Sequence, residues 1–64
     1  MNYSNMDIRR KAMENGVPLW KVAESLGMSE SGFSRKMRYE MNDDDKTKVF
    51  QAIENVKNGV VVNG

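Results

Sequence analysis

The chain has 64 residues, a formal net charge of +1, and neither cysteine nor histidine. This length predicts one small domain with a compact core, and the missing cysteine excludes disulfides as a supplement to that core. The chain also lacks the commonest metal ligands, the thiol nucleophile and the neutral-pH proton shuttle, so neither an enzyme nor a bound cofactor is expected.

The charge is distributed unevenly along the chain. Residues 1–39 carry seven basic and four acidic side chains, a balance of +3, whereas residues 40–64 carry three basic and five acidic ones, a balance of −2. Such asymmetry orients a small protein toward phosphate. No apolar run is long enough for a signal peptide or a membrane span, so we expect a cytoplasmic protein without membrane contact. We also expect no small-molecule substrate.

The first predicted helix covers about residues 5–15. Ser4 or Asn5 is its expected N-cap, and Gly16 is its expected left-handed terminator. Its apolar stripe is thin and consists of Ile8 and Ala12. The run Arg9-Arg10-Lys11 is expected on an exposed face, with contact to backbone phosphate as the alternative.

The second predicted helix begins at Pro18, where the missing N–H costs nothing, and ends at Gly27. Its apolar face repeats with helical spacing over Leu19, Val22, Ala23 and Leu26. Ser29 is the expected N-cap of the third helix, and Glu30 is well placed at the positive end of that helix. Phe33 and Met37 lie four residues apart and therefore share the core face.

A fourth predicted helix follows Asn42, with Asp43, Asp44 and Asp45 in its first turn. We interpret these carboxylates as helix N-terminal charges, because the glycine and closing glutamate of a calcium loop are missing. Its predicted core face is Val49, Ile53 and Val56, flanked by Phe50 and Ala52. Gly59 ends the helix, and the tail 59–64 is either a loosely packed terminus or, through Val60–Val62, a strand that pairs with a second chain in a homodimer.

Two short helices joined around a glycine form a helix-turn-helix, here residues 19–39 of a domain that covers residues 1–58. The string VPLWKVAESLGMSESGFSRKMRYE resembles the helix-turn-helix of phage Cro and repressor proteins, the XRE class, and especially the small regulators of phages and conjugative elements. The resemblance implies an all-α, four-helix, lambda-repressor-like domain whose third helix enters the major groove of double-stranded DNA. It also places the base-reading positions on Glu30, Ser31 and Arg35.

Departures from this family fall at two positions. Leu19 stands where a phosphate-binding glutamine is common, and Lys36 stands where repressors commonly have leucine, so Met37 takes the apolar position late in the helix.

A helical wheel of the third helix gives nearly the same face without the family. When Phe33 and Met37 set the core direction, Arg35 points away from it, with Ser31 and Arg38 beside it. We expect Arg35 to contact guanine, because arginine binds that base with two hydrogen bonds. The expected contacts to the DNA backbone are Trp20, Lys21, Ser29, Ser34, Lys36 and Arg38. For Trp20 the alternative is a boundary residue that covers the core, and Tyr39 is expected to close the core.

The sequence therefore predicts a sequence-specific DNA-binding protein, and the resemblance implies a small transcriptional regulator of a phage or mobile element. Two alternatives stay open at this point. One is a protein-interaction module that kept the fold and lost DNA binding. The other is an architectural or excisionase-like accessory factor of recombination.

Overall fold

Four helices and no strand make up residues 4–59, the part of the chain that the computed structural model describes. They are α1 (Met6–Glu14), α2 (Leu19–Ser25), α3 (Glu30–Met37) and α4 (Asp43–Lys57). The all-α prediction is confirmed. None of these helices is long and apolar enough to cross a bilayer. The tail Val60–Val62, and with it the homodimer hypothesis, lies outside the described residues.

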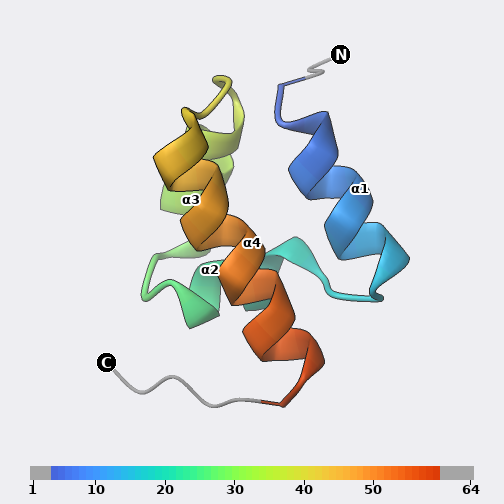
Figure 1. The fold of residues 1–64 in the computed structure, drawn as a ribbon. Coiled ribbons are helices and arrows are strands. Elements are labelled where there is room, and N and C mark those ends of the chain that lie inside the picture. The colour runs from blue at the N-terminus through green and yellow to red at the C-terminus, as the bar shows by residue number, and fades with distance from the viewer. Residues whose placement is uncertain (1–3, 60–64) are drawn as a thin grey trace.

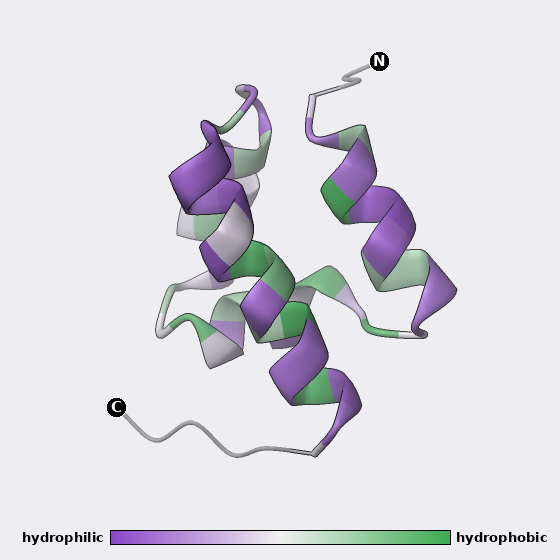
Figure 2. Ribbon diagram, viewed as in Figure 1, coloured by the Kyte–Doolittle hydropathy of each residue, from purple (hydrophilic) through white to green (hydrophobic). Residues whose placement is uncertain are grey.

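The core forms where the helices meet. Helix α4 contacts both α1 and α2, and α2 contacts α3. In the ribbon view α4 crosses in front of α2, and α1 stands along one side (Figure 1). The first turn of α4 is hydrophilic, and hydrophobic and hydrophilic residues alternate along its middle (Figure 2). The buried core consists of Ile8, Ala12, Val17, Val22, Ala23, Phe33, Met37, Val49, Ala52 and Ile53.

Side-chain caps fix the starts of the two later helices as the sequence predicts. The Ser29 hydroxyl oxygen accepts from the Gly32 N–H at 3.1 Å, and the Asn42 side-chain oxygen accepts from the Asp45 N–H at 2.8 Å. Each bond satisfies an N–H that has no partner inside its helix. The position at which α3 begins is therefore fixed by a hydrogen bond between residues only three positions apart.

The prediction that Pro18 is the first residue of the second helix is wrong by one position. Pro18 has an extended backbone, with φ −66° and ψ 144°, and α2 begins at Leu19. The Pro18 carbonyl accepts from the N–H groups of Lys21 and Val22, at 3.0 and 3.3 Å. Pro18 is therefore the N-cap residue: its own backbone is not helical, but its carbonyl accepts the first hydrogen bonds of α2.

The turn between α2 and α3 depends on Gly27. Its φ is +70°, and the Met28 N–H donates to the Ala23 carbonyl at 2.9 Å across the turn. A left-handed residue followed by such a bond is the usual glycine termination of a helix. The predicted end of the second helix is confirmed.

We expect Gly27→Val to destabilise the fold by more than about 1 kcal/mol, because a β-branched residue resists positive φ. A Cβ at Gly27 would meet nothing within 4 Å, so the Cβ itself adds no clash and the expected cost comes from the positive φ. Gly27→Asn is the matched control, since asparagine tolerates the left-handed region. Thermal melts compare the two variants. If both variants have the melting temperature of the parent protein, the turn does not require the positive φ of Gly27.

Candidate nucleic-acid interface

Helix α3 buries one face and exposes the rest of its side chains. Phe33 and Met37 are each 2 % exposed, which confirms the core direction used for the helical wheel. Arg35 is exposed on the opposite face. The other predicted DNA-contact residues of α3 are exposed as well: Glu30, Ser31, Ser34 and Lys36, with Arg38 directly after the helix.

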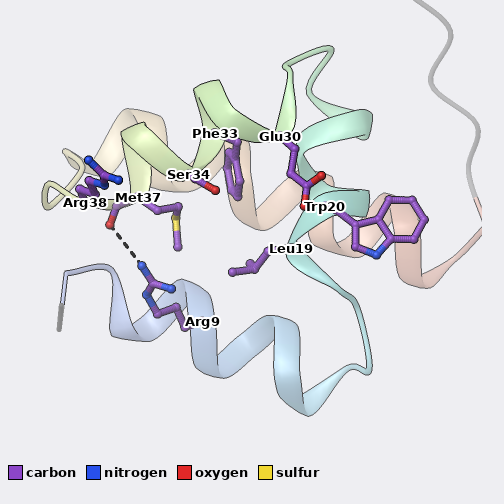
Figure 3. Close-up of a pocket in the computed structure, with 8 residues that line it drawn as sticks. All are labelled: Arg9, Leu19, Trp20, Glu30, Phe33, Ser34, Met37 and Arg38. Atoms are coloured by element: carbon purple, nitrogen blue, oxygen red, sulfur yellow. Dashed lines mark hydrogen bonds between the residues drawn. The ribbon is translucent and has the colours of Figure 1, made fainter. Parts of the chain in front are cut away.

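A hollow of about 280 Å³ lies beside α3, on its α1 side. Leu19, Phe33 and Met37 contribute its apolar wall. Figure 3 shows the polar side chains at its two ends: Arg9 and Arg38 lie at one end, and Glu30 and Trp20 at the other. The hollow therefore combines an apolar centre with charges of opposite sign at its ends.

A second, open hollow continues the first along the outer face of α3. It is lined by Glu30, Ser31, Ser34, Arg35 and Arg38. Glu30, Ser34 and Arg38 line both hollows, and they follow one another at intervals of four residues along one side of α3. The predicted base-reading residues Glu30, Ser31 and Arg35 are thus brought together on one surface.

Lys36 lies on the other side of α3, toward α4. It lines a hollow with Lys48 and Asp45 over a floor that includes Met41 and Val49. The sequence analysis did not single out Lys48. The position of Lys48 beside Lys36 could not be predicted from the sequence, because it depends on how α4 is rotated relative to α3. The two lysines and Asp45 leave this hollow with a balance of one positive charge.

The remaining predicted contacts to the DNA backbone lie at the starts of α2 and α3. Trp20 is 49 % exposed, and the Lys21 ammonium lies 5.6 Å from the centroid of its ring, a cation–π contact. Trp20 therefore sits at the edge of the core rather than over it. The Ser29 hydroxyl oxygen is already engaged as the cap of α3.

The prediction that Arg9-Arg10-Lys11 forms one exposed face is wrong for two of the three residues. The Arg9 guanidinium donates to the carbonyls of Ser4, at 3.1 Å, and Met37, at 3.4 Å (Figure 3). Lys11 pairs with the Glu54 carboxylate on α4 at 3.1 Å. These bonds hold both side chains against neighbouring segments, and only Arg10 is fully on the surface.

Asn5 is a buried polar residue that the sequence analysis considered only as an N-cap of the first helix. It makes no side-chain cap bond to α1. Its side-chain amide instead donates to the carbonyls of Met37, at 3.1 Å, and Tyr39, at 2.8 Å. Its side-chain oxygen accepts from the Met41 N–H at 2.9 Å. Asn5 therefore closes the C-terminal end of α3 and fixes the segment that leads into α4.

The expectation that Tyr39 closes the core is wrong, because its side chain is 73 % exposed. Helix α3 ends at Met37, and the chain then turns so that the backbone of Tyr39, not its ring, faces Asn5.

A small ion-pair network stabilises the same corner of the molecule. The Lys46 ammonium lies 2.9 Å from the Asp7 carboxylate and also pairs with Glu40. The hydrogen bond from Lys46 lowers the pKa of Asp7, and the Asn5 backbone N–H, followed by Lys46, lowers the pKa of Glu40. Both carboxylates therefore stay ionised and paired at neutral pH. The single charge of Lys46 offsets one of their two negative charges.

Three aspartates open α4. Asp43, Asp44 and Asp45 occupy its first turn as the sequence predicts, and within residues 4–59 no group of acidic side chains is arranged to hold a metal ion. Their position suits carboxylates next to unpaired helical N–H groups.

Comparison of the chain with models of protein families, with curated proteins and with solved structures finds no match in any of the three.

Proposed function

We propose that the protein binds double-stranded DNA by placing the exposed face of α3 in the major groove. The observation that carries this proposal is the charge of that face. Arg35, Lys36 and Arg38 stand against Glu30 alone over residues 30–38, a local balance of +2. Within residues 4–59, the side chains of Arg35 and Lys36 make no ion pair or hydrogen bond, so their charges are available to DNA.

The dimensions and rigidity of α3 support the proposal. Eight residues at 1.5 Å each give a helix about 12 Å long, and the major groove admits a helix of this kind. Buried Phe33 and Met37 fix the rotation of α3, while Ser29 and Asn5 hold its two ends. A reading helix needs such support, because base contacts require accurate placement of side chains.

The polar character of the face favours DNA over a protein-interaction module. Every exposed side chain of α3 is charged or carries a hydroxyl group, whereas the centre of a protein interface is depleted of charge. The large exposed apolar side chains of residues 4–59 lie outside α3, although Trp20 lines the hollow beside it and Tyr39 follows Arg38: Met6, Met13, Trp20 and Tyr39. A role as a small transcriptional regulator of a phage or mobile element rests on the sequence resemblance.

We expect the affinity for a mixed-sequence duplex to fall with salt, with a log–log slope of roughly −3 to −6 per chain. Lys36→Ala is expected to reduce the magnitude of this slope by about one, because one phosphate contact is lost. Lys57→Ala is the control, since it removes the same charge at the far end of α4. The measurement is a titration at several salt concentrations. Absence of binding even at low salt would contradict the proposal.

A further inference from the structure

Glu30 is the acidic member of a basic surface. It lines the outer hollow of α3 together with Arg35 and Arg38. Its carboxylate nevertheless makes no ion pair or hydrogen bond with any residue from 4 to 59. A carboxylate in this place repels phosphate and weakens a surface that binds only the DNA backbone. The N-terminal position of Glu30 in α3 favours its charge in the free protein, and in a DNA complex this carboxylate is favourable where it meets a hydrogen-bond donor.

We infer that Glu30 selects a cytosine in the major groove, an inference that rests on the proposed function. An ionised carboxylate only accepts hydrogen bonds. In the major groove guanine presents two acceptors, thymine presents an acceptor and a methyl group, and adenine presents a donor beside an acceptor. Cytosine alone presents an amino donor with no acceptor of its own, so it is the base that a carboxylate tolerates best.

Glu30 and Arg35 together predict the composition of the site. They leave α3 about 140° apart, at 100° per residue, and both line the outer hollow. Arg35 presents two parallel donors, which match the two acceptors of guanine. The preferred site therefore contains two G·C pairs, one read through cytosine and one through guanine.

The test is selection from random duplexes with the parent protein and with Glu30→Gln. Glutamine carries an NH₂ group that donates and a carbonyl oxygen that accepts, and together they match adenine. We expect the parent to recover cytosine at one position and Glu30→Gln to recover adenine there, each with a preference of about 5- to 150-fold. Glu24→Gln is the matched control, because it removes the same charge from an exposed position of α2 that lines none of these hollows.

Two results overturn the inference in distinguishable ways. If Glu30→Gln binds every duplex more tightly by the same factor and keeps the base preference of the parent, Glu30 acts through its charge alone. The proposed function then stands and only the cytosine assignment falls. If the parent binds no duplex at low salt, the proposed function itself is wrong. Melting curves establish that both variants are folded, and Glu30 is exposed, so we expect little change in melting temperature.

Discussion

Replacing Asn5 by alanine is expected to destabilise the protein by about 2–4 kcal/mol, which lowers the melting temperature of a domain this small by about 10–25 °C. The substitution removes the two bonds to the Met37 and Tyr39 carbonyls and the one from the Met41 N–H. Asn5 is fully buried, so no water replaces these partners directly. Its φ of +59° adds to the cost, because alanine tolerates that region less well than asparagine.

Asn55→Ala provides the matched control. Asn55 accepts one exposed hydrogen bond from Gln51 on the same helix, at 3.2 Å. Loss of such a contact changes stability by less than about 0.5 kcal/mol. Chemical and thermal unfolding of the two variants measure the difference. If they unfold together, Asn5 does not hold the end of α3 in the way its contacts indicate.

Replacing Arg35 by alanine is expected to cost about 1–3 kcal/mol on the preferred duplex and little on unrelated DNA. Arg35 points away from Phe33 and Met37, so it is the side chain of α3 that meets the base edges first. Lys36→Ala should weaken binding to all duplexes to a similar degree, because a lysine toward the α4 side reaches phosphate.

Affinities for the selected and a scrambled duplex, at matched salt, separate these two roles. Both variants should melt near the parent temperature, since neither side chain is buried. If Lys36→Ala abolishes discrimination while Arg35→Ala leaves it intact, α3 enters the groove rotated toward α4. The substitution of lysine for the leucine common in repressors would then mark a different reading face.

Sequence reasoning located the helices because their signals are local. Ser29 and Asn42 begin two helices through side-chain bonds to residues three positions away. Gly27 ends a helix because glycine tolerates the positive φ that this end requires. Phe33 and Met37 set the rotation of α3 by spacing alone, so the exposed face with Arg35 was predictable too. Pro18 shows the limit, because its φ suits both the N-cap and the first helical position.

The contacts that support α3 were not predictable, because they join residues far apart in sequence. Asn5 bonds to the backbone of residues 37, 39 and 41, and a backbone partner leaves no mark on the side chains there. Arg9 was interpreted as exposed for the same reason, since its partner is the Met37 carbonyl. Tyr39 was expected inside because tyrosine often completes a core, but the turn after α3 directs its ring to solvent.

The measurement that tests the central claim most directly is an amide NMR titration of the folded protein with a duplex at low salt. Binding through α3 predicts that the amide signals of residues 29–38 move most, together with those at the start of α2 around Trp20. The signals of the second half of α4, around Ile53 and Lys57, should stay in place, because no residue of that segment lines the hollow on the α1 side of α3 or the outer hollow. Shifts centred on α4 or on the outer side of α1, with α3 unchanged, would contradict the proposed interface.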